Sequence, residues 1–486
     1  MNRPIRTMAV FCLLLFLSLM ANATYLQYVK AGELNAHPDN RRVSVAAFSR
    51  ERGAILVVRE PVARSVPIDD EYQFQRTYPQ PLKYAHLTGY FSYFSQTAIE
   101  RSQNAFLSGD DSRLFVTRLV DLLTNASPQG GSVELTIDPR AQDAAYEGLR
   151  ALGEDVEGAV VALEPSSGKI LAMVSSPTFD PNRLASHDLG AVNDAYQDLD
   201  GQESQPLLNR AIQTRLPPGS TFKLVTAAAA IESGGYSADS QVPGGSSFQL
   251  PQSEDTVGNF DGGNCGGEQI TLTQALQVSC NVTFLTLADE LGAETMREQA
   301  EAFGFNSDYL EDLPLQAQSR YPEGMDPPFT ALSGIGQGDV AATPLQMAMV
   351  AAAIGNGGTV MRPYVVDTLR SPDLDSMDAI DSEEIGDAVS PGTARQLTEM
   401  MVATVAGGTA GSAAIPTIDV AGKTGTAQSA GDRPPYAWFV SFAPADNPEV
   451  AVAVMVESSG VPPGEISGGG LGGPIAKSVM EAVIQP

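Results

Sequence analysis

The chain has 486 residues, a length that suits two or three domains. It carries 58 acidic and 29 basic residues, a formal net charge of −29, which argues against nucleic acid or an anionic membrane surface as its partner. Three cysteines are too few for a structural zinc site, and the chain contains neither a G-x-S-x-G elbow nor an H-E-x-x-H motif.

The N-terminus contains an uncharged stretch, residues 7–29, preceded by two arginines. As a helix it would span about 35 Å, enough to cross a bilayer. A short basic N-terminus favours a cytoplasmic tip, so the rest of the chain is expected to be exported. Residues 21–23, Ala-Asn-Ala, also resemble a signal-peptidase site, which leaves a cleaved signal peptide as the alternative. Tyr25 and Tyr28 suit a membrane interface and favour an uncleaved anchor.

Residues 40–128 have a mixed pattern that predicts a small α/β module. Short strands are expected at residues 43–48 and 54–59, a turn or short strand at 89–93, and an amphipathic helix at 112–124. We find no nucleophile, metal cluster or phosphate loop in this part of the sequence, and we interpret it as a pedestal or assembly module.

The remaining two thirds predict a sheet covered by helices. We expect helices at residues 139–152 (capped by Asp138), 221–231, 271–278, 282–291, 343–355 and 474–484. We expect strands at residues 132–137, 159–163, 170–174, 418–428, 437–443 and 450–456. The Gly-rich residues 243–267 are expected to form a long loop over a cleft, and the Asp-rich residues 371–387 a solvated connector. Strand groups from both ends of one region, with helices between them, indicate a central antiparallel sheet.

Ser220 is the first candidate for chemistry. It follows Pro217-Pro218-Gly219 and precedes an alanine-rich run, so we expect it at the N-cap or first position of a buried helix. Lys223 lies three residues on, one turn along the same face, where a buried amine can take the hydroxyl proton. The alternative is a plain helix cap, a common role for serine. A second S-x-x-K, Ser166 to Lys169, falls in a predicted hairpin turn without a helix terminus.

Two further motifs follow in the chain. Ser279 and Asn281 lie in a break between two predicted helices, where a hydroxyl and an amide can project into a cleft. Residues 423–426, Lys-Thr-Gly-Thr, lie within a predicted strand. We expect Gly425 to leave room for a substrate backbone to pair along the strand. Lys423 with the hydroxyls of Thr424 and Thr426 forms a receptor for a carboxylate. The alternative for Ser279-Cys280-Asn281 is a plain polar kink, and a K-T-G triplet easily arises by chance.

The cysteines allow one disulfide in the exported part. Cys12 lies in the predicted membrane segment, so Cys265 and Cys280 are the two thiols beyond it, where oxidation is permitted. We expect them to pair and to tie the Gly-rich loop to the break that presents Ser279 and Asn281. Two free thiols are the alternative, because sequence does not show the Cα separation.

The order S-x-x-K, S-x-N, K-T-G is typical of penicillin-interacting serine enzymes. On these motifs the chain resembles the class B penicillin-binding proteins, and among them the short actinobacterial penicillin-binding protein A type. Weaker similarity runs through residues 51–55 and 87–90 in the pedestal and through residues 334–338, 342–346 and 438–440 later in the chain. The middle S-x-N residue is often Asp in this family and is Cys280 here.

The resemblance implies an α+β fold of three parts. A membrane anchor (1–29) would precede a pedestal or dimerisation-type domain (30–131) and a transpeptidase domain (132–486) with a five-stranded antiparallel sheet of the penicillin-binding and serine β-lactamase type. The protein would sit in the cell membrane as a single-pass protein with its catalytic domain outside the cytoplasm.

The resemblance also implies D,D-transpeptidation in peptidoglycan synthesis. Ser220 would attack a D-Ala-D-Ala stem peptide with Lys223 as base, and backbone N–H groups of Ser220 and Thr426 would hold the oxyanion. Ser279, positioned by Lys423, would pass a proton to the departing D-alanine, whose carboxylate rests on Thr424 and Thr426. Asn281 would hold the peptide amide. An amine from a neighbouring stem would then resolve the acyl-enzyme. β-Lactams would acylate Ser220, no cofactor or metal would be needed, and a SEDS-type membrane polymerase would supply the glycan.

Two other readings share these motifs. A D,D-carboxypeptidase or β-lactamase would use water as acceptor, but the E-x-x-x-N element of class A β-lactamases does not occur between Asn281 and Lys423. Intact motifs argue against a non-catalytic scaffold, and a short cytoplasmic tail would leave a β-lactam sensor little to signal with. The sequence leaves the division or elongation role, the acceptor amine and the oligomeric state open.

Overall fold

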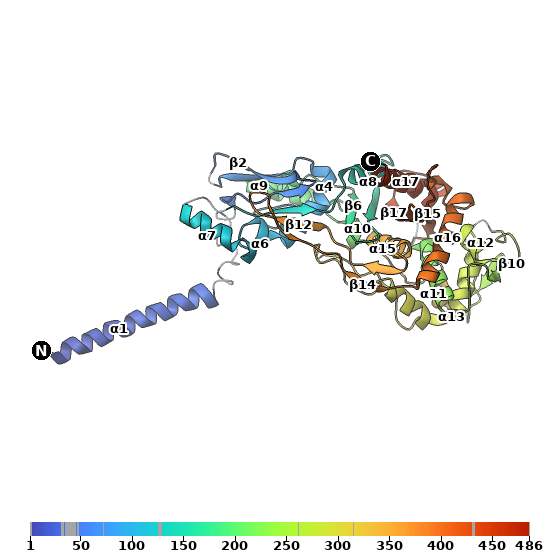
Figure 1. Cartoon of the computed structure of the whole chain (residues 1–486), viewed down its shortest axis with the longest axis horizontal. Helices are drawn as coiled ribbons and strands as arrows, with labels where there is room; N and C mark the ends of the chain where they lie inside the picture. Colours follow the sequence, from blue (N-terminus) through green and yellow to red (C-terminus); the bar gives the residue numbers. More distant parts are fainter. Residues whose placement is uncertain are drawn as a thin grey trace.

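The computed structural model describes residues 2–30, 34, 45, 48–70, 72–124, 129–260, 262–313, 315–429 and 433–485. The molecule is elongated: a single helix projects from one end, and two packed domains follow along the long axis (Figure 1). The projecting helix α1 (Asn2–Thr24) continues into a π-helical turn, η1 (Tyr25–Val29). Its residues are exposed, and the stretch Arg3–Val29 is the one helix in the described residues long and apolar enough to cross a membrane.

The first domain is built on a six-stranded sheet in the order β13-β12-β4-β1-β2-β3. Its strands are β1 (Ile55–Val57), β2 (Glu60–Pro67), β3 (Phe74–Thr77), β4 (Ser132–Leu135), β12 (Val366–Arg370) and β13 (Ser376–Ala379). All pairs are antiparallel except β1 and β4, which run parallel. The sheet therefore joins the pedestal region to three strands that come from beyond residue 131.

Helices of the first domain are α4 (Pro81–Thr88), α5 (Ala98–Ser102), α6 (Asn104–Leu107) and α7 (Phe115–Thr124), the last preceded by the 3-10 turn η2 (Ser112–Leu114). The expected helix at residues 112–124 is thus present, with the Asp111 side chain accepting from Arg113 N at its start. The strand expected at residues 43–48 falls mostly outside the described residues, and its described members Val45 and Phe48 are helical.

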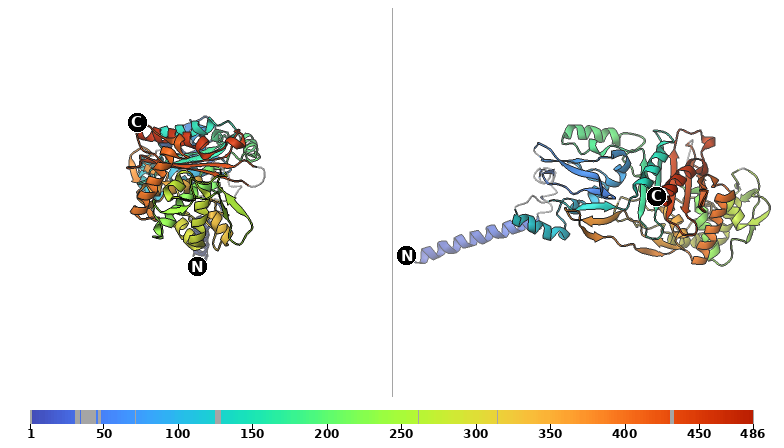
Figure 2. Two further views of the ribbon diagram at one scale, coloured as in Figure 1. Left: turned by 90° about the vertical axis from the view of Figure 1, so that its right-hand side faces the viewer. Right: turned by 45° about the horizontal axis from the view of Figure 1, so that its top comes forward.

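The second domain is built on a five-stranded antiparallel sheet in the order β15-β16-β17-β5-β6. Its strands are β5 (Glu157–Leu163), β6 (Ile170–Ser176), β15 (Ala421–Ala427), β16 (Tyr436–Ala443) and β17 (Val450–Ser458). This is the predicted sheet made of hairpins from the two ends of the region. Figure 2 shows it edge on, with helices on both faces.

Alternation along the strands divides the core into two layers. Val160 and Ala162 of β5 pack with α8 (Pro139–Arg150) and α17 (Gly473–Ile484), whereas Ala159 and Val161 face the cluster that contains α11 (Lys223–Glu232) and α15 (Pro344–Gly355). Because both faces are covered, every residue of β16 is buried. In Figure 1, α8 and α17 lie on one side of the sheet and α11 on the other.

The remaining helices are α9 (Leu189–Asp200), α10 (Arg210–Gln213), α12 (Leu272–Gln277), α13 (Asn281–Ala302), α14 (Pro327–Ser333) and α16 (Pro391–Gly407). Of these, α9, α10, α14 and α16 were not predicted. The expected helix end at Leu291 is a kink: Gly292 has φ +79° and ψ 162°, and helix continues to Ala302.

Two segments expected to be irregular contain strands. Residues 243–267, expected as a loop, carry β8 (Ser247–Gln249) paired with β9 (Thr256–Gly258), flanked by the pair β7 (Gln241–Pro243) and β10 (Gln269–Thr271). Residues 371–387, expected as a connector, contain β13 and β14 (Glu384–Asp387), the latter paired with β11 (Thr359–Met361). Both β13 and β14 are fully exposed, so backbone pairing forms them without the buried apolar face that sequence patterns detect.

Candidate active site

Ser220 lies at the start of α11, but not where the sequence predicted. It belongs to a 3-10 turn, η4 (Gly219–Phe222), and the α-helix itself begins at Lys223. The prediction of an N-cap or first α-helical position is therefore wrong by one turn. Gly219 has φ +53°, and Thr221 Oγ1 donates to Pro218 O at 2.7 Å, which tightens the turn before the helix. The turn presents Ser220 to a cleft of about 890 Å³.

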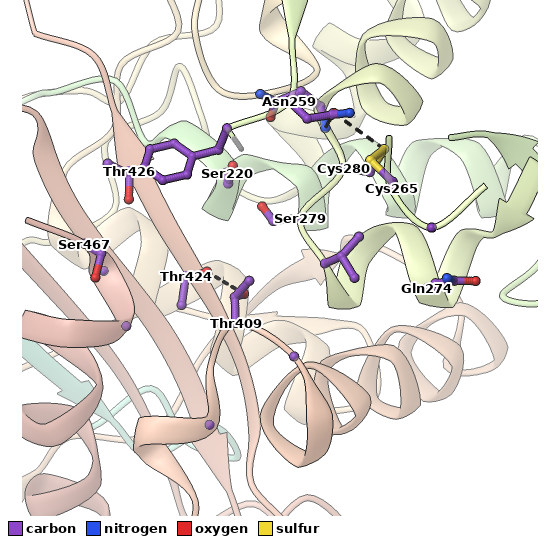
Figure 3. A pocket seen from close by; sticks show the side chains of 18 of the residues that line it. Ser220, Asn259, Cys265, Gln274, Ser279, Cys280, Thr409, Thr424, Thr426 and Ser467 are labelled. Carbon is purple, nitrogen blue, oxygen red and sulfur yellow. Dashed lines mark hydrogen bonds between the residues drawn. A yellow bond between two sulfur atoms is a disulfide. The ribbon is translucent and has the colours of Figure 1, made fainter. Parts of the chain in front are cut away.

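Ser279 lies in the break between α12 and α13, with φ +58°. A left-handed conformation is uncommon for a non-glycine residue and is found at active sites more often than elsewhere. Figure 3 shows the Ser220 and Ser279 side chains close to each other in the same cleft. The structure thus brings the first two predicted motifs together.

The third motif lies on β15, which is an edge strand of the sheet. Thr424 and Thr426 line the cleft, whereas Lys423 is fully buried and donates to Ser279 Oγ at 3.0 Å and to Thr424 O at 2.9 Å. The edge leaves backbone groups of β15 free to pair with an extended ligand.

Two lysines converge on the Ser279 hydroxyl. Lys223 Nζ donates to Ser279 O at 2.7 Å, to Ser279 Oγ at 3.2 Å and to Asn281 Oδ1 at 2.8 Å. Burial, and after it the charge of Lys423, holds the pKa of Lys223 well below its usual 10.5. Burial also lowers the pKa of Lys423, to about 7. The site therefore favours at least one neutral amine beside the serine hydroxyls.

Ser220 and Lys223 are not hydrogen-bonded to each other among the described residues; the amine is directed to Ser279 and Asn281 instead. Hydrogen bonds of a catalytic base are often long before substrate binds and shorten in the reacting complex. Ser279 Oγ, which accepts from both Lys223 and Lys423, therefore lies at the centre of the polar network.

Asn281 is engaged at both ends of its side-chain amide. Its Oδ1 accepts from Lys223, and its Nδ2 donates to Gly258 O at 2.9 Å. It was expected to hold a substrate amide. In the structure it connects the lysine to Gly258, the last residue of β9.

The interpretation of Gly425 changes. A Cβ atom at this position would lie 2.9 Å from Pro218 O, 3.0 Å from Thr221 Cγ2 and 3.0 Å from Trp438 Cβ. The missing side chain thus leaves room for the turn that carries Ser220, rather than for a ligand strand as the sequence suggested. Glycine here lets the first and third motifs approach each other.

Cys265 and Cys280 form a disulfide, the pairing expected from the sequence. The disulfide joins the end of the segment 243–267 to the residue between Ser279 and Asn281. Both cysteines line the cleft (Figure 3).

The sequence did not identify several residues of the cleft. Thr409, just after α16, shares a hydrogen bond of 2.7 Å with Thr424 through their hydroxyl oxygens, and Ser467 lines the cleft with glycines 468–470. Thr409 lies 15 positions before Thr424, and its only sequence signal is a hydroxyl after a glycine pair. Asn259 lies above the disulfide in Figure 3 and is likewise without a motif.

The second S-x-x-K lies elsewhere. Ser166 is in the turn between β5 and β6, as predicted, and Lys169 pairs with Asp367 at 2.9 Å. In the part of the chain that the structure describes, no cluster of three or more His, Cys, Asp or Glu side chains could hold a metal ion. The cleft offers a hydroxyl nucleophile, buried amines and hydroxyls on an edge strand, which are groups that acyl transfer uses.

Comparison with known proteins matches both domains. Residues 158–481 match the penicillin binding protein transpeptidase domain, and residues 52–133 match the penicillin binding protein A dimerisation domain. The chain is 43% identical over 492 residues to the peptidoglycan D,D-transpeptidase PbpA of Mycolicibacterium smegmatis, covering 100% of this chain and 99% of the relative.

Solved structures of penicillin-binding protein A are similar to this chain over most of its length. Penicillin-binding protein A of M. tuberculosis, as its ceftriaxone acyl-enzyme complex, superposes with a TM-score of 0.87 at 42% identity, covering 91% of this chain and 100% of that one. Its penicillin G acyl-enzyme complex gives a TM-score of 0.84 at 42% identity, covering 90% and 100%.

Proposed function

The chain belongs to the penicillin-binding protein transpeptidases and is a peptidoglycan D,D-transpeptidase that binds β-lactams covalently; from this premise we propose that Ser220 is its nucleophile and that Lys223, Ser279 and Lys423 move the protons. The observation that carries the assignment is the convergence of two buried lysines on Ser279, beside Ser220 in one cleft.

In the acylation step, Ser220 Oγ attacks the carbonyl between the two D-alanines of a stem peptide. Neutral Lys223 takes the serine proton, since burial lowers the pKa of this amine. Backbone N–H groups of Ser220 and Thr426 hold the oxyanion. The close approach of Gly219 to Thr426, where a Cβ would lie 3.1 Å from Thr426 O, supports this pairing of donors.

Collapse of the tetrahedral intermediate breaks the C–N bond and leaves an ester on Ser220. Ser279 Oγ passes a proton to the departing D-alanine nitrogen and regains one from the adjacent lysines, both of which donate to it. The substrate carboxylate rests on the hydroxyls of Thr424 and Thr426 beside the buried charge of Lys423.

An amine from a neighbouring stem peptide then attacks the ester and forms the cross-link. Its proton returns through the same network, which restores the Ser220 hydroxyl. β-Lactams enter at the first step and form the ester on Ser220 because they imitate the D-Ala-D-Ala unit.

We place the protein in the cell membrane as a single-pass protein with its catalytic domain outside the cytoplasm. The apolar helix α1 supports an anchor, and the Cys265–Cys280 disulfide fits an oxidising compartment. The described fold consists of the anchor, the six-stranded sheet and the transpeptidase domain. We also propose that a SEDS-type membrane polymerase supplies the glycan strands.

A transpeptidation assay tests the proposal. Purified protein, supplied with a D-Ala-D-Ala stem peptide and an amine acceptor, should release one D-alanine for each cross-link found by mass spectrometry, and Ser220→Ala should do neither. Release of D-alanine with a free carboxylate product alone would assign a carboxypeptidase instead.

A further inference from the structure

We infer that Asn259 is a positioning residue for catalysis: it caps the N-terminus of α13 from outside the helix and thereby fixes Asn281 against Lys223. This inference rests on the proposed role of Lys223. Its basis is that the Asn259 side chain, which lies outside the three sequence motifs, is hydrogen-bonded to Asn281, the residue that holds Lys223.

The N-terminus of α13 lacks a cap of its own. Its N-cap residue is Cys280, whose side chain makes no capping hydrogen bond because its sulfur is committed to the disulfide with Cys265. The first N–H groups of a helix need an acceptor, which Ser, Thr, Asp or Asn at the N-cap usually supplies.

Asn259 supplies that acceptor. Its Oδ1 accepts from Asn281 N at 2.9 Å and from Val282 N at 3.2 Å. Its Nδ2 donates to Gly245 O at 2.9 Å and to Gly263 O at 2.8 Å, so the amide meets backbone groups in all four directions. Figure 3 shows Asn259 above the break, beside the disulfide.

The neighbouring residue completes the clamp. Gly258 O accepts from Asn281 Nδ2, so residues 258 and 259 hold both the main chain and the side chain of Asn281. This leaves Asn281 Oδ1 directed at Lys223 Nζ, 2.8 Å away. Lys423, which also donates to Ser279 Oγ, is the charged group that faces the Lys223 amine. The centroid of the Phe284 ring lies 5.5 Å from Lys223 Nζ.

The consequence for the chemistry follows from this chain of contacts. Without the cap, the first turn of α13 frays and Asn281 Oδ1 leaves Lys223, so the amine is no longer held beside the serines. Small misplacements of a reacting group have large kinetic costs. Loss of the acceptor also removes a hydrogen bond that favours the ammonium form, so the pKa of Lys223 falls further.

The experiment measures the second-order rate of Ser220 acylation by a fluorescent penicillin from pH 5 to pH 10. We expect Asn259→Ala to slow acylation about 10- to 100-fold. In this variant, the fall of the acylation rate on the acid side of the pH profile should occur at lower pH than in the wild type. Asn259→Asp keeps the acceptor but loses both donors, and it should acylate within about threefold of the wild type because Asp and Asn cap equally well.

Gln249→Ala is the matched control. Like Asn259, Gln249 lies in the segment 243–267 and donates from its side-chain amide to two backbone carbonyls, Ser253 O at 2.7 Å and Asp255 O at 3.0 Å. Among the described residues it makes no hydrogen bond to Asn281. It should leave the rate and pH profile unchanged. Near-UV circular dichroism and thermal melting report whether each variant is folded.

Two results would overturn the inference. One is wild-type acylation and an unmoved acid limb in Asn259→Ala. The other is that Asn259→Ala and Asn259→Asp slow acylation equally and that neither variant shifts the pH dependence of the rate. That result would mean that Asn259 only stabilises the segment 243–267. Mapping the penicillin adduct on the wild-type protein distinguishes these two results from a failure of the proposed function. An adduct on a residue other than Ser220 would contradict the assignment of Ser220 as the nucleophile.

Discussion

At the scale of single residues, the site depends on keeping amines buried. Lys223 and Lys423 are both fully buried and both donate to Ser279 Oγ, so a proton on one disfavours a proton on the other. Glu100 in the first domain shows the opposite solution. Burial alone would raise the pKa of its carboxyl, but Arg76 and Arg52 outweigh that and lower it. The carboxylate keeps its charge because arginine partners neutralise it, whereas burial lowers the pKa of both lysines, and the neutral one of the pair, Lys223, can act as the base.

The lysine pKa values predict a pH dependence. Lys223 acts as a base only when neutral, and its lowered pKa makes it neutral well below pH 10.5. Acylation should therefore remain fast well below pH 10.5 and slow as the pH drops through the lowered pKa. Stopped-flow acylation across pH 5 to 11 checks this. A rate that keeps rising to a midpoint near 10.5 would show that Lys223 has the pKa of an exposed lysine.

At the scale of elements, the sequence predicted most of the transpeptidase sheet. Its strands are apolar runs bounded by turns, and the capped helices α8 and α15 begin where Asp138 and Thr343 place them. The 3-10 turn at Ser220 was missed because it depends on the close approach of β15, which is a tertiary contact. The strands β8, β9, β13 and β14 were missed because they lack buried apolar faces.

The same limit applies to the site residues. The three motifs could be found because their spacing within the chain is fixed. Thr409 and Asn259 act through partners 15 and 22 positions away, and nothing in the local sequence distinguishes either from an ordinary loop residue.

Gly425→Ala tests how β15 meets the turn that carries Ser220. The new methyl group would press on Pro218 O and Trp438, so η4 must shift and acylation should slow at least about tenfold. The loss should appear in the rate of the chemical step rather than in ligand affinity. Gly460→Ala, where a Cβ meets nothing within 4 Å, is the control. A pure affinity loss in Gly425→Ala would return the glycine to its expected role in ligand pairing.

The disulfide gives a second test at this scale. It closes a loop across a sequence separation of 15, so its removal should lower the free energy of unfolding by about 3 kcal/mol in the chain-entropy account. Reduction should also slow acylation, because Cys280 lies between Ser279 and Asn281. Urea unfolding and acylation rates with and without reductant provide the measurement. An unchanged acylation rate after confirmed reduction would limit the bridge to a structural role.

At the scale of the whole molecule, the two domains are joined through α4. Lys83 O accepts from Gln142 Nε2 of α8 at 2.8 Å, and His86 contacts the second domain through a hydrogen bond of 2.9 Å between Nε2 and Pro206 O. Burial lowers the pKa of His86 to about 4, so this contact keeps a neutral ring at physiological pH. The transpeptidase domain is thus held on the first domain, and α12 and β15, which carry residues that line the cleft, lie at the end away from α1 (Figure 1).

The proposed anchor predicts how the full chain behaves in membranes. The full-length protein should stay with membranes after carbonate extraction and begin near Met1. A chain that starts at residue 45 should be soluble and acylate at the same rate, because α1 makes no contribution to the cleft. N-terminal sequencing that starts at Thr24 would instead identify a cleaved signal peptide.

The most direct test of the central claim is the site of penicillin attachment. Wild-type protein is incubated with a labelled penicillin, digested and mapped by mass spectrometry, beside Ser220→Ala and Lys223→Ala. We predict one adduct per chain on Ser220, none in Ser220→Ala, and labelling slowed by orders of magnitude in Lys223→Ala. An adduct that persists in Ser220→Ala, or that maps to Ser166 or Ser279, would contradict the account.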